Sequence, residues 1–417
     1  MMPLPIDTVL GDLKAALGVG AAAVLQAPPG SGKTTRVPLA LLDEPWLAGR
    51  RIVMLEPRRL AARAAAAYMA GLLGEPVGRT VGYRVRMDTR VGPQTRIEVV
   101  TEGVLTRLMQ RDPSLAGTGL VIFDEFHERH LEADLGLALC LDLQGVLNQD
   151  LKLLVMSATM ETGPVAALLG GVPVVACEGR LFEVQTRYAG RGGGQTLDRQ
   201  VAAAVLEAAA AEAGSILAFL PGAPEIRRVL ALLQASRLGP EWMLAPLFGN
   251  LTREEQDRAI APAPAGRRKI VLATNIAETS LTIEGIRVVV DSGFARAPRF
   301  DVRSGMTRLV TLPVARASAD QRCGRAGRTG PGVCIRLWSE GAHGSLTPRN
   351  TPEILQADLA ALALELAAWG VDSPGRLRWL DPPPAAAFDQ ARQLLFEVGA
   401  LDGAGAVTRH GRRMAEL

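Results

Sequence analysis

The stretch APPGSGKTT at 27–35 decides the fold, because a glycine-rich turn ending in lysine and threonine holds phosphate only between a strand and a helix. A short, largely apolar stretch at 24–26 (Val-Leu-Gln) precedes it, and a helix-forming segment follows. Backbone N–H groups at the helix start face phosphate, the lysine reaches the β and γ oxygens, and the threonine can bind Mg²⁺. Ala27 stands where this motif usually has glycine, so the turn must form without a positive φ. The candidate nucleotide-binding residues are Gly30, Ser31, Gly32, Lys33, Thr34 and Thr35, with Thr34 also a candidate metal ligand.

Two carboxylates follow an apolar stretch at 120–123 that is typical of a buried strand. The carboxyl ends of parallel strands meet at the edge of the sheet where a phosphate-binding loop lies. We therefore expect Asp124 to bind Mg²⁺, directly or through water, and Glu125 to orient and deprotonate an attacking water. The alternative is an ordinary acidic loop after a strand.

A row of arginines, QRCGRAGR at 321–328, stands nearly 200 residues after the acids. Arg325 and Arg328 follow Gln321 by four and seven positions, which would place all three on one helical face, directed at a developing phosphate charge. A solvated basic helix is the alternative, although two glycines within the row would weaken it. The long separation indicates an NTP site divided between two domains.

Short apolar stretches alternate with helical ones in two successive sets, which is typical of βαβ units and parallel sheets. The first set of expected strands lies at 24–26, 52–55, 97–100, 120–123 and 153–156. The second set lies at 216–220, 243–247, 270–273, 288–290 and 333–335. Glycines at 190–194 predict a surface loop, and extended stretches between 293 and 312 predict a β-hairpin. Helices are expected at the N-terminus, at 354–369 and at 385–397.

Composition limits the possible classes of protein. The chain has 417 residues, 48% of them hydrophobic, enough for two or three domains, and a net charge of only +3. Nucleic-acid binding would therefore depend on local patches. Four cysteines without CxxC spacing and four scattered histidines argue against a zinc site, and free thiols fit a reducing cytoplasm. We expect no membrane-spanning segment, because no apolar stretch is long enough.

Further motifs stand in a recognisable order with the first three. They are EPRRLAAR at 56–63, TEGVL at 101–105, SAT at 157–159 and TNIAETSLT at 274–282. With these, essentially the whole chain resembles the DEAH-box class of superfamily-two helicases, closest to its bacterial HrpB type, with Phe126 in place of the usual alanine. The resemblance implies an α/β fold of two tandem RecA-like P-loop domains, 1–179 and 180–345, followed by a small winged-helix domain, 346–417.

The resemblance also implies roles for individual residues. Ser280 would sense the γ-phosphate, Gln321 would help to position water, and Arg325 and Arg328 would be arginine fingers. The candidates for contacts with the RNA backbone are Arg58, Arg59, Thr101, Thr274 and Asn275. The candidates for coupling the nucleotide site to the domain interface are His127, Ser157 and Thr159. Thr101 and Thr274 could instead cap the segments that follow them.

The nucleobase would lie between side chains from the two domains. Counting along the helix after 57–59 places Tyr68 where the family has a stacking arginine, and the count before 262–264 points to Ile260. Neither side chain reads a hydrogen-bonding edge, so we expect hydrolysis of all four NTPs with a modest preference for purines. Tyr68 as helix packing and Ile260 as core are the alternatives.

The expected hairpin is rich in arginine, with Arg296, Arg299, Arg303 and Arg308 against Asp301. Physical chemistry alone allows either a solubilising surface or a wedge for nucleic acid. In the resembled family this hairpin lies where duplex strands separate, which favours the wedge. Aromatic residues make up only 4% of the chain, so tracking of the backbone is expected rather than stacking of bases.

The sequence therefore predicts an ATP-dependent RNA helicase that can also use other NTPs and needs Mg²⁺. The resemblance implies that it moves 3′ to 5′ on single-stranded RNA or RNA with a 3′ tail. It would work in the cytoplasm as a monomer. An RNA-stimulated NTPase that remodels ribonucleoproteins without unwinding would carry the same motifs. A non-hydrolysing scaffold would be expected to lack Lys33 or Glu125, and a P-loop kinase has no use for a second sheet ending in arginines. Because 407–417 resembles the end of the family's winged helix, we expect the chain to be a fragment.

Overall fold

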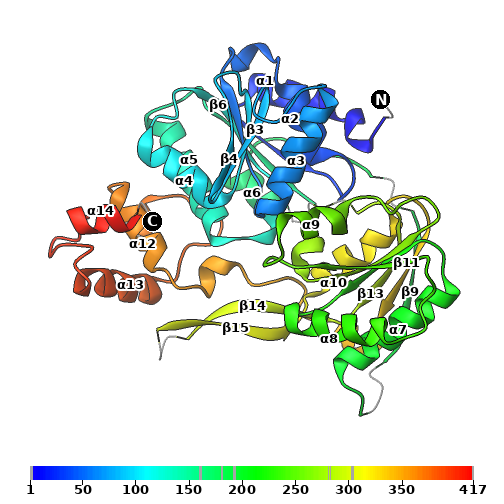
Figure 1. The fold of residues 1–417 in the computed structure, drawn as a ribbon. Coiled ribbons are helices and arrows are strands. Elements are labelled where there is room, and N and C mark those ends of the chain that lie inside the picture. The colour runs from blue at the N-terminus through cyan, green and yellow to red at the C-terminus, as the bar shows by residue number, and fades with distance from the viewer. Residues whose placement is uncertain are drawn as a thin grey trace. The chain divides into compact units, whose positions relative to one another are not determined.

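The computed structural model describes residues 3–158, 162–179, 182–190, 194–279, 281, 283–301 and 305–415. Two units make up the chain (Figure 1). One comprises Met1–Gly179, Phe300–Thr307 and Thr351–Leu417, and the other comprises Arg180–Arg299 and Arg308–Asn350. Each α/β unit is organised around its own sheet.

The first unit contains a sheet of eight strands. In chain order they are β1 (Ala22–Gln26), β2 (Arg51–Leu55), β3 (Val81–Val85), β4 (Asp88–Arg90), β5 (Ile97–Val100), β6 (Thr118–Phe123), β7 (Lys152–Ser157) and β8 (Val174–Ala176). In the sheet their order is β4-β3-β5-β2-β6-β7-β1-β8, and only β3 and β4 pair antiparallel. The crossover connections bring the carboxyl ends of β1 and β6 to the same edge, which positions the loops that follow them.

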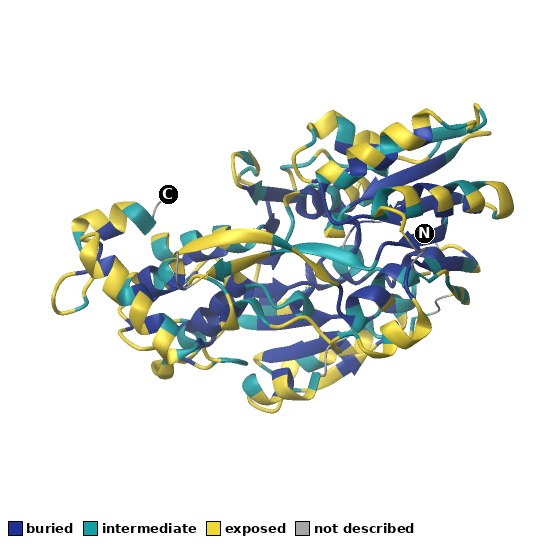
Figure 2. Ribbon diagram, turned by 90° about the horizontal axis from the view of Figure 1, so that it is seen from below, coloured by how far each residue is buried: buried dark blue, intermediate teal, exposed yellow. Residues whose placement is uncertain are grey.

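Helices cover both faces of this sheet because its central strands are apolar on both sides. The helices are α1 (Leu10–Val19), α2 (Lys33–Leu41), α3 (Arg59–Leu72), α4 (Glu102–Arg111), α5 (Leu131–Val146) and α6 (Thr162–Leu168). Ile52 and Met54 of β2 pack in one cluster with α1, α2 and α3, whereas Val53 and Leu55 pack in another with α4, α5 and α6. Figure 2 shows these strands as buried. Over the described residues, no helix is both long and apolar enough to span a membrane.

The second unit contains a parallel sheet of six strands. They are β9 (Val184–Tyr188), β10 (Ser215–Phe219), β11 (Trp242–Leu247), β12 (Arg268–Ala273), β13 (Ile286–Asp291) and β16 (Gly332–Arg336). Their order is β11-β12-β10-β13-β16-β9. The helices are α7 (Leu197–Ala211), α8 (Ala223–Gln234), α9 (Arg253–Ile260), α10 (Arg316–Cys323) and α11 (Glu340–Gly344). In both sheets the strands predicted from apolar stretches are confirmed within one or two residues at each end.

The predicted hairpin is present as β14 (Phe294–Asp301) and β15 (Met306–Pro313). Residues of β15 are mostly exposed, as the yellow ribbon in Figure 2 shows. Arg299 and Arg308 are exposed, whereas Arg296 is half-buried and donates to Glu225 at 3.3 Å. The positions predicted for Arg303 and for most of the loop at 190–194 lie outside the described residues.

The C-terminal segment is helical and belongs to the first unit. Its helices are α12 (Ala360–Ala368), α13 (Ala385–Glu397) and α14 (Arg409–Ala415), and Leu401 and Val407 form one antiparallel bridge. The helix predicted at 385–397 is confirmed, but the one at 354–369 is wrong in its first half. A short 3₁₀ helix, η6 (Glu353–Leu355), is followed by a break, and the Asp358 carboxylate accepts the N–H of Ala360 at 2.9 Å. This local bond competes with helix formation, so α12 begins later. The winged helix and the boundary at 346 stay predictions.

Candidate active site

The phosphate-binding loop joins β1 to α2 and has the geometry that its glycines predict. Gly30 and Gly32 have φ of 82° and 96°, the left-handed region that glycine enters without a steric cost. A side chain at Gly32 would also meet the Leu4 side chain at 2.7 Å. The loop begins at Ala27 without a positive φ, as expected, and the Ala27 N–H donates to the Ser157 carbonyl at 2.9 Å. Ser31 is 2% exposed and its buried hydroxyl oxygen has no hydrogen-bond partner in the described structure, which suits a phosphate contact.

Thr34 and Asp124 meet where the two loops come together. The Thr34 hydroxyl donates to Asp124 Oδ2 at 2.5 Å, and Asp124 Oδ1 accepts the N–H of Glu125 at 2.8 Å. Thr35 lies one residue further along α2, and its hydroxyl contacts the Gly32 carbonyl at 3.5 Å. The predicted metal candidates are thus in direct contact, although 90 residues separate them in the sequence.

Lys33 and Glu125 form a buried ion pair, with Lys33 Nζ 3.0 Å from Glu125 Oε1. Burial alone would lower the pKa of Lys33, but the charges of Glu125 and Asp124 outweigh it and raise that pKa. Burial would raise the pKa of Glu125, yet Lys33 and His127 lower it. The pKa of Asp124 is raised to about 6, first by burial and also by the Glu125 charge, with Lys33 acting against both. Glu125 is therefore an anion at neutral pH.

A hard divalent cation fits this corner. Hydroxyl and carboxylate oxygens are the ligands Mg²⁺ prefers, and a cation beside Asp124 would offset the burial that raises its pKa. Within the described ranges, no cluster of three or more His, Cys, Asp or Glu side chains could hold a metal ion by itself. An ion at Thr34 and Asp124 would therefore take its remaining ligands from phosphate oxygens and water.

Glu125 is held in a strained backbone conformation, with φ 50° and ψ 33°. A non-glycine residue in the left-handed region costs energy and persists only when its surroundings enforce it. His127, in the 3₁₀ helix η3 (Phe126–Glu128), provides one such contact: its Nδ1 lies 3.5 Å from Glu125 Oε2 and 3.4 Å from the N–H of Ala158. His127 thus connects the acids to the end of β7, where Ser157 lies. Thr159, predicted beside Ser157, falls outside the described residues.

The arginine row does not form one continuous helical face. Helix α10 ends at Cys323, and the 3₁₀ helix η5 (Gly324–Gly327) follows, because the glycines at 324 and 327 do not sustain the α-helix. Arg325 and Arg328 still converge, since both donate to the carbonyl of Leu281, Arg328 at 3.0 Å. Arg325 is 4% exposed and also donates to the Glu278 carbonyl at 2.9 Å. Gln321 lies on α10, one turn before them, and is half-buried.

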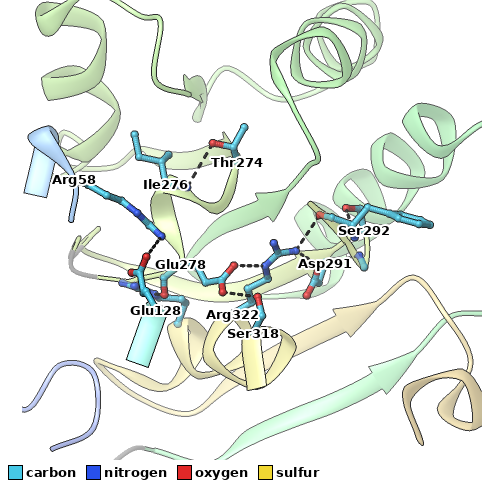
Figure 3. Close-up of polar contacts among 12 residues, drawn as sticks. Arg58, Glu128, Thr274, Ile276, Glu278, Asp291, Ser292, Ser318 and Arg322 are labelled. Atoms are coloured by element: carbon cyan, nitrogen blue, oxygen red, sulfur yellow. Dashed lines mark hydrogen bonds and ion pairs between the residues drawn. The ribbon is translucent and has the colours of Figure 1, made fainter. Parts of the chain in front are cut away.

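Sequence reasoning missed Arg322, which is the most buried arginine of the row at 0% exposed. Figure 3 shows its guanidinium between two carboxylates: it donates to Glu278 at 2.9 Å and to Asp291 at 2.9 Å. Ser318 donates to the other oxygen of Glu278. The network fixes the segment around Glu278 against the arginine row. The sequence did contain a signal for this network. Asp291 directly follows the apolar stretch at 288–290, just as Asp124 directly follows the apolar stretch at 120–123.

The predicted RNA-contact residues of the first unit lie at the starts of helices. Arg58 precedes α3, is half-buried and forms an ion pair with Glu128 at 2.8 Å, as Figure 3 shows, while Arg59 is exposed. Thr101 is the N-cap residue of α4, but over the described residues its side chain makes no capping hydrogen bond. The capping alternative therefore does not account for Thr101.

The corresponding residues of the second unit lie after β12. The Thr274 hydroxyl accepts the N–H of Ile276 at 3.5 Å and so caps the 3₁₀ helix η4 (Asn275–Ala277), as the alternative predicted, while Asn275 is exposed. Ser280 lies outside the described residues. Of the two nucleobase candidates, Tyr68 is 55% exposed on α3, so it is not helix packing, and Ile260 is half-buried at the end of α9.

The fold and these loops define a class of protein: a P-loop NTPase with two tandem α/β domains, of which the second carries an arginine row. The family described as DEAD/DEAH box helicase matches residues 13–167, and the family described as helicase conserved C-terminal domain matches residues 200–330. The chain therefore belongs to the DEAD/DEAH-box helicase family.

Individual relatives agree with this assignment. The chain is 51% identical over 417 residues to the ATP-dependent RNA helicase HrpB of Escherichia coli (strain K12), covering 100% of this chain and 51% of the relative. It is 39% identical over 408 residues to the probable ATP-dependent RNA helicase DHX34 of Mus musculus, covering 94% and 35%. The crystal structure of Escherichia coli DEAH/RHA helicase HrpB matches with a TM-score of 0.94, 51% identity, and coverage of 99% and 52%. The chain thus spans about half the length of the HrpB relative, or less in the case of DHX34.

Proposed function

We propose that this chain hydrolyses ATP, and other NTPs, at a site divided between its two α/β domains, and uses the energy to move 3′ to 5′ along single-stranded RNA. The observation that supports the proposal most strongly is that the half-buried Thr34 meets the buried Lys33, Asp124 and Glu125 at the edge of the first sheet. RNA helicases are named among its relatives at 51% and 39% identity.

In this proposal the first domain holds the triphosphate. The backbone N–H groups from Gly30 to Lys33 and the Ser31 hydroxyl bind its oxygens, and the positive end of α2 faces the charge. Thr34 and Asp124 would hold Mg²⁺, which would supply positive charge against the negative charge that develops on the phosphates. Arg325 and Arg328 of the second domain stabilise that charge when the two domains close.

In this proposal, binding of NTP weakens the ion pair between Lys33 and Glu125 and so makes Glu125 a better base. A bound γ-phosphate offers Lys33 a second anionic partner, which draws the ammonium away from Glu125 Oε1. Losing that partner raises the pKa of Glu125 from its lowered value, since Lys33 is the main cause of the lowering. The carboxylate then accepts a hydrogen bond from the attacking water and, late in the reaction, its proton.

RNA binding would rest on contacts that do not read sequence. Arg58, Arg59, Thr101, Thr274 and Asn275 offer guanidinium, hydroxyl and amide groups, which suit phosphates and 2′-hydroxyls. The exposed Arg299 and Arg308 of the hairpin would contact the duplex where its strands part. We further propose that the protein acts as a monomer in the cytoplasm, a reducing compartment that fits its four free thiols.

The rate of NTP hydrolysis tests the proposal directly. It should be measured with RNA, with single-stranded DNA and without nucleic acid, each with ATP, GTP, CTP and UTP. Stimulation by RNA, with all four NTPs hydrolysed and a modest preference for purines, is the expected result. No hydrolysis under any condition would refute the proposed activity.

A strand-displacement assay separates helicase from remodelling NTPase. Duplexes with a 3′ tail, a 5′ tail and no tail should be compared at saturating ATP and Mg²⁺. We expect preference for the 3′ tail, with weak unwinding relative to hydrolysis. RNA-stimulated hydrolysis without displacement of any duplex would support the remodelling alternative, and a preference for 5′ tails would contradict the proposed polarity.

A further inference from the structure

Two cysteines of the second unit lie together beside the arginine row, and the proposed NTP chemistry uses neither. Cys323 is the last residue of α10, and Cys334 lies in the middle of β16. Both are free thiols, and both adjoin Thr186, which pairs with Cys334 in the strand ladder and whose hydroxyl lies near Cys323 Sγ. They stand eleven positions apart in the sequence, so their proximity comes from the fold.

The strand register explains why the two thiols meet. Cys334 pairs with Thr186 of β9 across the parallel ladder, and the Thr186 hydroxyl lies 3.6 Å from Cys323 Sγ. The end of α10 therefore rests on this pair of strands. Cys334 is fully buried, whereas Cys323 is partly exposed. A small oxidant can therefore reach Cys323, but not Cys334.

The surroundings also favour the thiolate of Cys323 over that of the other cysteines. The neighbouring Cys334 thiol is the main cause that lowers the pKa of Cys323 to about 6, against burial, and Thr186 and the Arg336 charge act in the same direction. Burial raises the pKa of Cys140 to about 12 and also raises that of Cys177. Because the thiolate is the nucleophile, Cys323 should react first.

We propose that Cys323 and Cys334 form an oxidation site that takes a hydroperoxide as its co-substrate. The Cys323 thiolate attacks the peroxide oxygen, the O–O bond breaks, and with one proton the products are a sulfenic acid and water (or an alcohol from an organic peroxide). The Cys334 thiol then attacks the sulfenic sulfur, a disulfide forms, and a second water leaves. Two thiols are oxidised by two electrons, and one hydroperoxide is reduced.

The disulfide should slow NTP turnover, because it would form beside the arginine row. Cys323 lies between Arg322, whose two carboxylate contacts are both 2.9 Å long, and Arg325, which holds the carbonyls of Glu278 and Leu281. A disulfide bond of about 2.05 Å is roughly 1.5 Å shorter than a contact between thiols, so the end of α10 must move towards β16. The arginines on either side would then move out of position.

Peptide mapping after oxidation tests the proposal. The full chain is treated with hydrogen peroxide at pH 7, alkylated and digested with trypsin, which releases Cys323 in residues 323–325 and Cys334 in residues 329–336. We expect these two peptides to be disulfide-linked, with a mass 2 Da below their sum. We also expect ATP turnover to fall at least tenfold and to recover with dithiothreitol. The effect on turnover rests on the proposed function, whereas the cross-link does not.

Matched variants make the outcomes decisive. Cys323→Ala should form no linked peptide and keep its turnover in peroxide, Cys334→Ser should form no linked peptide, and Cys140→Ser should behave like the parent. Absence of the linked peptide in the parent, or earlier oxidation of Cys140 or Cys177, would overturn the proposal. Equal loss of turnover in Cys323→Ala, or a cross-link that leaves turnover unchanged, would overturn its effect on the arginine row. A parent that hydrolyses no NTP before oxidation would count against the proposed function alone.

Discussion

Glu125 combines a left-handed backbone, a buried carboxylate and an ion pair with Lys33. The backbone angle directs its carboxylate towards Lys33 and His127 rather than along the axis of β6. Strain of this kind is retained at sites where geometry matters more than stability. The sequence alone predicts Glu125 as a candidate site residue. It does not predict the strained backbone, because no local pattern specifies a positive φ for glutamate.

Replacing Glu125 with glutamine separates chemistry from binding. Glu125→Gln keeps the shape and one hydrogen-bond acceptor but removes the base, so turnover should fall by at least about 10²-fold while NTP still binds. Single-turnover hydrolysis and equilibrium binding of a labelled NTP measure the two effects. Glu207→Gln, a change at an exposed position of α7, is the control. Turnover near that of the parent would remove Glu125 from the proposed role.

Tyr68 offers a second test at a single side chain. Its ring is 55% exposed on α3, which suits stacking on a nucleobase. Tyr68→Ala should raise the KM for NTP in proportion to a loss of about 1–3 kcal/mol of stacking, with kcat almost unchanged. Tyr68→Phe keeps the ring and should keep the KM. Steady-state kinetics with ATP and CTP would decide, and an unchanged KM in Tyr68→Ala would contradict the stacking role.

At the scale of elements, the buried network around Arg322 joins α10 to β13 and to the loop after β12. Breaking a buried ion pair leaves unpaired carboxylates, here Glu278 and Asp291, which costs about 3–5 kcal/mol. Arg322→Ala should therefore shift the urea-unfolding transition of the second domain to much lower concentration. Arg253→Ala removes an exposed pair with Asp257 on α9 and should cost only about 0.3–0.5 kcal/mol. Similar shifts for both variants would show that the buried ion pairs of Arg322 do not stabilise the second domain.

The prediction of elements from sequence succeeded where one local pattern sufficed. Apolar stretches locate the buried strands because both faces of a parallel sheet are covered. The helix predicted from residue 354 failed because the Asp358 side chain competes for backbone N–H groups within that stretch. Arg322 was missed because its two partners lie 44 and 31 residues away, a pairing that no spacing within the row reveals.

At the scale of the whole molecule, the C-terminal segment is bonded to the loop that follows Asp124 and Glu125. Arg129 donates to Asp134 at 3.0 Å and lies 2.8 Å from Asp381, and its carbonyl accepts the N–H of Glu353 at 3.0 Å. The Glu353 carboxylate in turn accepts the N–H of Leu131 at 3.0 Å. Residues more than 200 positions apart thus hold the segment after Glu125 in place, an arrangement that the sequence did not predict.

Where the C-terminal segment meets α4, a buried carboxyl group should make the free energy of unfolding depend on pH. Burial raises the pKa of Glu365, on α12, to about 7, although the Gln110 hydrogen bond and the Arg107 charge act against it. The unfolded chain loses this proton near pH 4.3, so between about pH 4.5 and 7 the folded state binds the proton and the unfolded state does not. The stability contributed by the group is therefore complete at low pH and is lost as pH rises through 7, by at most about 4 kcal/mol.

Glu365→Gln carries no charge at any pH, so it tests whether titration of this carboxyl group causes the pH dependence of stability. The variant should unfold at higher urea than the parent at pH 8 and at nearly the same urea at about pH 4. Glu397→Gln, an exposed change on α13, should alter neither midpoint. Stabilisation of Glu365→Gln that is equal at both pH values would contradict the titration.

The central claim, a hydrolytic site completed by the second domain, is tested most directly by single-turnover ATP hydrolysis of Arg325→Ala and Arg328→Ala in the presence of RNA. ATP binding and urea unfolding should be measured in parallel, with the exposed Arg258→Ala as control. The account predicts that each arginine variant binds ATP with an affinity within a few-fold of the parent but hydrolyses it about 10³-fold more slowly, the scale of an arginine finger. Folded variants that hydrolyse ATP at the parent's rate would contradict it.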